Sequence, residues 1–213
     1  MILIIGAGGH GQVVADIFRA RRASQLVSDH VGFVDDDRAC LGCVFVDSPV
    51  LGTLAQVHEI AHDAVIVGVG DNATRSKIFH QYLAAGERIA TAEHPRSIVA
   101  ADVTIGSGSM LCAGAIVNTG AAIGRNVIVN TGATVDHHSI LGDHAHIAPG
   151  VHLAGEVVVD EGALVGIGAI VLPRVRIGAW STVGAGAVVT ADVPPGSTVV
   201  GVPARVLPVA ATV

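Results

Sequence analysis

The chain has 213 residues, which allows one large domain or two small ones. Hydrophobic residues make up 51% of it but aromatic residues only 3%, so any core is built from aliphatic side chains. The formal net charge of −6 argues against nucleic acid or an anionic membrane as a partner. With no basic leader after Met1, no apolar run approaching about 18 residues and three cysteines, the sequence predicts a cytoplasmic protein without a disulfide framework.

The N-terminal segment has the pattern of a nucleotide-binding turn. A buried strand over residues 2–5 leads into the loop GAGGHG at 6–11, which opens a helix extending to about residue 22. This is a GxGxxG motif directly after a strand, whose glycines let the backbone approach a phosphate at the helix N-terminus. A second strand over 31–34 ends in Asp35 and Asp36, which suit a ribose hydroxyl or a base. A nucleotide site is expected here, with a plain strand-to-helix turn and a nicotinamide cofactor as alternatives.

Alternating strand and helix patterns continue to about residue 92. They are a helix over 53–61, a strand over 64–68, the turn Gly70-Asp71-Asn72, a helix over 73–85 and a last strand over 88–91. This alternation predicts a small α/β domain at 1–92, Rossmann-like and with a parallel sheet. A complete dinucleotide fold needs about twice as many strands, so we expect one nucleotide rather than two.

From Val99 to Val189 an aliphatic residue returns at every sixth position. Helices have a period of 3.6 and strands of 2, so this period indicates a parallel β-helix in which each hexapeptide is one short strand and a corner. Gly, Asn or Asp immediately follows many of the aliphatic residues, and we place the tight corner there because these residues tolerate a positive φ. Three hexapeptides make one coil, so the segment 93–213 is expected to stack about five coils into a triangular prism.

The histidines of the repeat stand out among apolar side chains. They are His137, His138, His144, His146 and His152. His137 and His138 follow Asp136 and are expected along the exposed strand beyond that corner. His146 lies half a coil further on, which places it on a different face from His137. The two can therefore meet only where a second subunit comes alongside.

Together these motifs resemble the hexapeptide-repeat sugar O/N-acyltransferases, which acetylate nucleotide-linked 4-amino sugars of the bacillosamine and perosamine type. The shared features are the glycine loop, the Asp pair, Gly-Asp-Asn before a helix carrying Arg75, and the segment NTGATVDHH at 130–138. The resemblance covers nearly the whole chain. It implies a left-handed β-helix, a homotrimer, acetyl-CoA as co-substrate, no metal, and N-acetylation of the 4-amino group of a nucleotide-linked sugar.

The resemblance also implies roles for individual residues. His137 matches the general base, Asn130 lies near the reacting centre, and His146 matches the histidine that contacts the acetyl thioester. Residues that match the coenzyme A groove are Gly155, Ile167 and Ala185. Arg205 lies near the nucleotide end of coenzyme A, where it meets a phosphate or is only a solvated charge. Residues that match the nucleotide-sugar pocket are Gly8, Gly9, His10, Asp35, Asp36 and Gly70.

One position departs from the family pattern. The family commonly has a carboxylate directly after the base, which orients the imidazole, and this chain has His138 there. Either Asp136 or Asp143 substitutes for that carboxylate, or His137 works unaided. The candidate catalytic set is therefore His137, Asp136, His138 and Asn130.

Other functions remain open from the sequence. Gamma-class carbonic anhydrases are also trimeric β-helices, and they hold zinc with histidines of adjacent subunits. The acceptor is alternatively a sugar hydroxyl, which would make the protein an O-acetyltransferase. A non-enzymatic sensor of nucleotide sugars is the remaining alternative.

Overall fold

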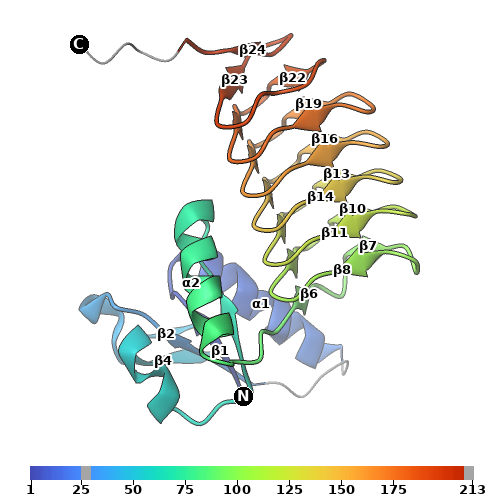
Figure 1. Cartoon of the computed structure of the whole chain (residues 1–213). Coiled ribbons are helices and arrows are strands. Elements are labelled where there is room, and N and C mark those ends of the chain that lie inside the picture. The colour runs from blue at the N-terminus through green and yellow to red at the C-terminus, as the bar shows by residue number, and fades with distance from the viewer. Residues whose placement is uncertain (25–29, 209–213) are drawn as a thin grey trace, which may run out of the picture.

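The structure is a computed structural model that describes residues 1–24 and 30–208 (Figure 1). Its N-terminal part is an α/β layer, and its C-terminal part is a column of stacked coils. Helix α2 (Asn72–Ala84) stands between the N-terminal sheet and the lower coils. No helix in these described ranges combines the length and apolar character that membrane crossing requires.

The N-terminal sheet has five strands in the order β3-β4-β2-β1-β5. Their bounds are β1 Ile2–Ile5, β2 Val31–Val34, β3 Val44–Phe45, β4 Ser48–Gly52 and β5 Ala64–Val67. The strands β1, β2, β4 and β5 are parallel, while β3 pairs antiparallel with β4. Strands β1, β2 and β5 are buried throughout, as in a parallel sheet covered on both faces. The predicted parallel sheet is confirmed, and the β3–β4 hairpin is an element that sequence reasoning missed.

The helices largely follow the sequence prediction, with two corrections. Helix α1 spans Gly9–Ala23, close to its predicted range. The helix expected over 53–61 is only a 3₁₀ helix at Leu54–Glu59, which begins with a capping box between Thr53 and Gln56. A further 3₁₀ helix spans Arg38–Cys40. The strand expected over 88–91 is reduced to a bridge between Val65 and Ile89, because the chain then turns to pair with the coils.

The C-terminal part is a parallel β-helix with three faces, which we name by their numbers of strands. The six-strand face contains β7 (Ile98–Val99), β10 (Ile116–Val117), β13 (Thr134–Val135), β16 (His152–Leu153), β19 (Ile170–Val171) and β22 (Val188–Val189). The five-strand face contains β8 (Thr104–Ile105), β11 (Ala122–Ile123), β14 (Ile140–Leu141), β17 (Val158–Val159) and β20 (Arg176–Ile177). The eight-strand face contains β6 (Ala92–Glu93), β9 (Met110–Leu111), β12 (Ile128–Val129), β15 (His146–Ile147), β18 (Leu164–Val165), β21 (Thr182–Val183), β23 (Thr198–Val200) and β24 (Arg205–Val206).

The coils stack in strict register. Thr134 of β13 pairs with Ile116 of β10 on one side and with His152 of β16 on the other. A residue therefore lies directly above the residue 18 positions earlier, and residues at this spacing form columns. The predicted domain boundary at 92 falls inside β6, which already pairs with β9.

The aliphatic residue of each hexapeptide points inward, as predicted. From Leu111 to Val189 these residues are at most 4% exposed and form one continuous cluster. Val99 and Ile105 belong to the first coil, are partly exposed and pack against the same cluster. The hexapeptide period therefore identifies the core of the column.

The corners differ from the sequence prediction. We expected the left-handed residue immediately after each inward aliphatic residue, but it lies three residues after it, at every sixth position from Gly108 to Gly186. The glycines directly after the aliphatic residues have another cause, because a Cβ on Gly106 would lie 2.6 Å from the backbone of Gly124 in the next coil. Close stacking of the coils, and not a positive φ, therefore explains the glycines at this position. Side chains that occupy the left-handed position include Asn126, His138, His144, Glu156 and Trp180.

Candidate active site

The glycine loop lies at the carboxyl edge of the sheet, between β1 and β5. The strand order reverses around β1 at this edge, and open α/β sheets bind ligands at such points. Gly6 (φ 102°) and Gly11 are required by the turn itself, since a Cβ on Gly11 would overlap the carbonyl oxygen of Gly6. A Cβ on Gly8 or Gly9 would meet nothing within 4 Å. Internal packing therefore does not require glycine at these two positions, and the N-terminus of α1 is accessible.

Asp35 and Asp36 follow β2 at the same edge. The Asp35 carboxylate accepts hydrogen bonds from the N–H groups of Ala7 (2.7 Å) and Asp37 (2.8 Å). The Asp36 carboxylate accepts from the N–H of Leu54 at 3.0 Å and is exposed. Asp35 therefore fixes the loop after β2 to the glycine loop, and Asp36 leaves one oxygen facing solvent.

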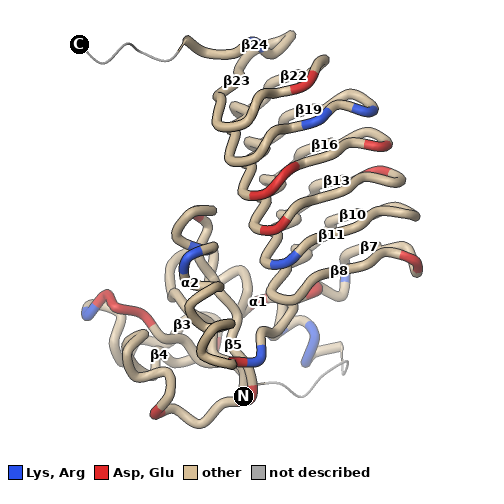
Figure 2. Tube along the Cα trace, in the orientation of Figure 1, with Lys and Arg blue, Asp and Glu red and all other residues tan. Residues whose placement is uncertain are grey.

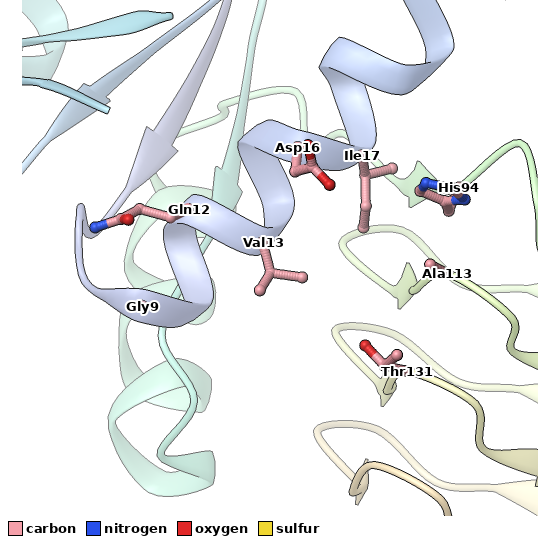
Figure 3. Close-up of a pocket in the computed structure, with 8 residues that line it drawn as sticks. All are labelled: Gly9, Gln12, Val13, Asp16, Ile17, His94, Ala113 and Thr131. Atoms are coloured by element: carbon pink, nitrogen blue, oxygen red, sulfur yellow. The ribbon is translucent and has the colours of Figure 1, made fainter. Parts of the chain in front are cut away.

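A cavity of about 380 Å³ separates α1 from the corners of the β-helix (Figure 3). Its lining residues are Gly9, Gln12, Val13, Asp16 and Ile17 of α1, and His94, Ala113 and Thr131 of the coils. Figure 3 shows Val13 and Ile17 extending from α1 toward the corners that carry Ala113 and Thr131. The start of α1 and the residue after Asn130 thus border one cavity.

His146 lies on the eight-strand face, against the N-terminal domain. Its ring centroid is 6.2 Å from that of His10, and its Nε2 accepts a hydrogen bond from the Asn130 amide at 3.1 Å. The backbone of Gly70 also lies near the His146 ring. The structure therefore brings together four predicted site residues, two from each side of the domain boundary.

Burial keeps these two histidines neutral. Desolvation, then the charge of Arg75 and the nearby His10, lowers the pKa of His146 to about 3. Desolvation and then Arg75 lower the pKa of His10 to about 4. His146 is therefore a neutral hydrogen-bonding group at neutral pH, and not a cation.

Arg75 of α2 is completely buried between the two parts of the chain. Its guanidinium donates to four backbone carbonyl groups, those of Val69 (3.3 Å), Gly70 (3.0 Å), Asn126 (3.2 Å) and His144 (2.7 Å). Its contacts thus join the loop after β5 to two consecutive coils. Sequence reasoning noted Arg75 as a motif residue but missed this position.

His137 and His138 lie in the turn between β13 and β14, and not along a strand as expected. The cause is the left-handed backbone of His138, with φ of 57°, which belongs to the corner. The Nδ1 atoms of the two rings are 3.1 Å apart, and the ring planes meet at 78°. A Cβ on Gly155, one coil above, would lie 2.5 Å from Nε2 of His137, so the imidazole occupies the space that this glycine leaves free.

The carboxylates considered as partners of His137 are engaged elsewhere. Asp136 Oδ1 accepts from the Asn118 amide (2.8 Å) and from the N–H of His137 (2.7 Å). These bonds, that of Asn118 first, hold the pKa of Asp136 below its usual value. Asp143 forms an ion pair with Arg125 at 2.7 Å. The group in contact with the His137 ring is therefore His138.

The remaining histidines have structural contacts. His144 is buried, its Nδ1 accepts from the Asn126 amide (2.8 Å), and its ring packs on His80 at 4.9 Å. His152 lies on the six-strand face, where its Nδ1 is 2.9 Å from the Thr134 hydroxyl. Within the described ranges, no three or more His, Cys, Asp or Glu side chains are placed to hold a metal ion together.

Comparison with known proteins gives matches to both parts of the chain. Residues 1–82 match the PglD N-terminal domain. The 2,3,4,5-tetrahydropyridine-2,6-dicarboxylate N-acetyltransferase of Staphylococcus aureus is 39% identical over 74 residues, which is 31% of this chain and 31% of that protein. The aligned part therefore spans about a third of such curated relatives.

Solved structures match over almost the whole chain. The acetyltransferase domain of PglB from Neisseria gonorrhoeae FA1090, in complex with acetyl coenzyme A, is 37% identical with a TM-score of 0.90, over 97% of this chain and 98% of that one. PerB from Caulobacter crescentus, in complex with CoA and GDP-perosamine, is 37% identical with a TM-score of 0.89, over 97% of both chains. This chain belongs to the hexapeptide-repeat sugar acetyltransferases. The likeness also confirms the fold class, a Rossmann-like α/β domain followed by a left-handed β-helix.

The residues that the sequence analysis predicts for a coenzyme A groove lie at two different corners. Gly155 lies above His137, at the corner between the six-strand and five-strand faces. Ile167 and Ala185 lie at the corner between the eight-strand and six-strand faces, and Ile167 is 62% exposed. Arg205 lies on β24, exposed, with its guanidinium on the carbonyl of Ala204 (2.9 Å). Within one chain these four residues do not come together.

Proposed function

We propose that this protein transfers the acetyl group of acetyl-CoA to the 4-amino group of a nucleotide-linked sugar. The observation that carries the proposal is the likeness to PerB over 97% of both chains, since that structure contains CoA and GDP-perosamine. In this proposal residues 1–92 hold the nucleotide sugar, and residues 93–213 hold the acetyl donor. Both substrates are cytoplasmic metabolites, so we place the protein in the cytoplasm.

The proposed reaction is a direct transfer with His137 as general base. The sugar amine attacks the carbonyl carbon of the acetyl thioester, the C–S bond breaks, and an amide forms. His137 Nε2 accepts the proton that the amine loses and returns it to the departing thiolate, which balances the reaction. General-base catalysis of this kind contributes roughly 10²- to 10⁴-fold in rate. The N–H of Gly155 is our candidate donor to the carbonyl oxygen as its charge develops.

The glycine loop supports the proposal for the nucleotide. Gly8, Gly9 and Gly70 lack a packing reason for being glycine, as their nearest neighbours leave a Cβ about 4 Å or more of space. They border the N-terminus of α1, where backbone N–H groups favour a diphosphate. The free oxygen of Asp36 suits a ribose hydroxyl or a base. The cavity beside Gly9 extends from the start of α1 to Thr131, the residue after Asn130.

A homotrimer is part of the proposal. His137 and His146 belong to different parts of one chain, so a shared site requires a neighbouring chain. The six-strand face between the two groove corners exposes Ile98 (65%) and Ile170 (42%), which favours its packing against another subunit. In a closed threefold ring each chain offers this face to one neighbour and its eight-strand side to the other, giving three equal sites.

The decisive experiment is an acetyl-CoA consumption assay with a panel of nucleotide-linked 4-amino sugars and their 4-hydroxy analogues. We expect turnover with at least one amino sugar and none with its hydroxy analogue. His137→Ala should lower kcat by roughly 10²-fold or more, because the proposed base is lost. The control His58→Ala changes the same residue type at an exposed position of the N-terminal domain and should retain kcat within about threefold. No turnover with any amino sugar, or an unchanged rate in His137→Ala, contradicts the proposal.

Subunit mixing tests the shared site. The variants His137→Ala and His146→Asn are unfolded together and refolded as a mixture, so that chains associate at random. If each site takes His137 from one chain and His146 from its neighbour, about one quarter of the sites are intact and activity reappears at about that level. If both residues act within the same chain, the mixture stays inactive and the proposed interface is wrong.

A further inference from the structure

His138 stands where the family commonly has a carboxylate, and the structure shows how it contacts the proposed base. Its Nδ1 is 3.1 Å from Nδ1 of His137, which is hydrogen-bonding distance. A neutral imidazole has one donor and one acceptor nitrogen, so one ring donates here and the other accepts. The direction of this bond decides which nitrogen of His137 has a lone pair for a substrate proton.

The position of His138 depends on the column beneath it. At φ of 57° its side chain turns down over Gly120, one coil below, where a Cβ would lie 2.7 Å from Cδ2 and 3.0 Å from Nε2 of the ring. Gly120 therefore leaves the space in which the Cδ2–Nε2 edge of His138 rests. The opposite edge of the ring, with Nδ1, faces His137.

Asp102 lies below that edge, one coil further down the same column. Its Oδ2 accepts hydrogen bonds from the Thr119 hydroxyl (2.8 Å) and from the N–H of Gly120 (2.9 Å), the residue on which His138 rests. These two bonds, followed by smaller effects that include His138, hold the pKa of Asp102 below its usual value. An ionised carboxylate is therefore anchored under the Nε2 edge of His138.

Other charged groups near the pair do not select a nitrogen. Asp136 is held by Asn118 and the N–H of His137, on the backbone side of the ring. Glu156 and Arg174 continue the column above His138 and have opposite charges. Figure 2 shows both acidic and basic positions among the corners of the upper coils. Asp102 is the carboxylate of this column on the Nε2 side of His138.

We infer that Asp102 and His138 are positioning residues that fix the proton on Nδ1 of His137. The inference rests on the proposed function, in which His137 is the base. The negative charge of Asp102 favours the His138 tautomer with its proton on Nε2. Nδ1 of His138 is then an acceptor, His137 donates its Nδ1 proton to it, and Nε2 of His137 keeps the lone pair. That nitrogen faces the space left by Gly155. Two residues thus replace the single carboxylate, one supplying the contact and the other the charge.

The first test reads the tautomers without substrate. In ¹⁵N-histidine-labelled protein at about pH 8, long-range ¹H–¹⁵N spectra distinguish Nδ1–H from Nε2–H. We expect Nδ1–H at His137 and Nε2–H at His138 in the natural protein, and a mixture of tautomers in Asp102→Asn. Nε2–H at His137, or no change in Asp102→Asn, overturns the inference. This result does not depend on which substrate the enzyme uses.

The second test uses kinetics with the amino sugar that the natural protein acetylates. His138→Gly removes the imidazole but suits the left-handed backbone, and it should lower kcat about 10- to 100-fold with both KM values within about twofold. His138→Asn also suits this backbone and keeps an acceptor for the His137 proton, so it should recover most of the loss. Asp102→Asn should lower kcat about three- to tenfold and move the acidic limb of the rate profile to lower pH, because a negative charge near the base is lost.

Glu156→Gln is the matched control, since it removes a carboxylate from the same column on the other side of His138. It should leave kcat within about twofold of the natural value, because Glu156 does not lie on the Nε2 side of His138. Equal effects of Asp102→Asn and Glu156→Gln would mean that general charge, and not tautomer selection, acts on the base, and the inference would be wrong. An active natural protein with full activity in His138→Gly would also overturn it, while leaving the proposed function intact.

Discussion

Arg75 gives the sharpest test of how the two parts of the chain are joined. It is fully buried, and its four hydrogen bonds go to carbonyl oxygens of the loop after β5 and of two coils. Burial lowers its pKa to about 10, so it remains charged at neutral pH. We consider the substitution Arg75→Met, which keeps much of the length and the packing but removes every donor.

The expected loss follows from two opposing effects. Four charge-assisted hydrogen bonds at about 1.5–3 kcal/mol each sum to roughly 6–12 kcal/mol. Removing the guanidinium also removes its desolvation cost, which is several kcal/mol for a buried ion. The net expectation is a loss of about 3–5 kcal/mol in the free energy of unfolding. Arg75→Lys keeps the charge but not the planar fork of donors, so its stability should lie between those of the natural protein and Arg75→Met.

The assay is urea unfolding at a fixed protein concentration, followed by the fluorescence of the single tryptophan, Trp180. Arg19→Met is the control, because Arg19 is about half exposed and its ion pair with Asp16 should contribute about 0.5 kcal/mol at most. A loss below about 1 kcal/mol in Arg75→Met would refute the reasoning. It would mean that the four carbonyl groups find water or other donors at little cost.

Three further predictions separate stability from binding and catalysis. Gly9→Val should raise the KM for the nucleotide sugar about tenfold with little loss of stability. Gly11→Val should instead destabilise the protein by several kcal/mol, because only a Cβ at Gly11 would meet backbone atoms. Melting curves and KM values measured on both variants check this contrast. Gly155→Ala should lower kcat about 100-fold while unfolding stays within about 1 kcal/mol, because its Cβ displaces the imidazole of the proposed base; a normal kcat contradicts this. His10 and His146 have lowered pKa values in the folded chain, about 4 and about 3, so unfolded chains bind more protons and stability is lost as pH falls from about 6.5 toward 4. Each should contribute about 1.4 kcal/mol per pH unit, and urea midpoints that do not change from pH 7 to 5 would contradict it.

The hexapeptide period predicts the core because burial repeats with the coil. Val117, Val135 and Leu153 lie one above another and are buried for the same reason. The period does not predict which outward residues are covered. Met110 and Ile128 point outward from the eight-strand face and are nevertheless fully buried, because the N-terminal domain packs there.

A sequence signal for the position of His146 does exist. His146 is the next outward residue in the row of Met110 and Ile128, two large apolar side chains in succession. An apolar outward row indicates a covered face, and a histidine that continues it is expected at the edge of the covering domain. Asn126 gives a similar signal, because it occupies a corner position that is more often glycine. A polar side chain there indicates a local contact, and its amide donates to His144.

The arrangement of His137 and His138 was beyond sequence reasoning, since it depends on which residue takes the left-handed corner. An error of two positions along the repeat moves His138 from a strand to the turn and changes what its ring contacts. The glycine loop was easier, because its motif is local and its turn is formed by neighbouring residues. The chemistry of the corner depends instead on columns of residues 18 apart.

The column also predicts that substitutions within it are coupled. A carboxylate at position 138 would supply both contact and charge to His137, so Asp102 would have no further task in a His138→Glu background. We expect Asp102→Asn to lower kcat about three- to tenfold beside His138, and to change it within about twofold beside His138→Glu. The measurement is a double-mutant cycle on kcat at saturating substrates. Equal effects in both backgrounds would mean that Asp102 acts on the active site independently of His138, because two residues that form one pathway to the base cannot contribute additively.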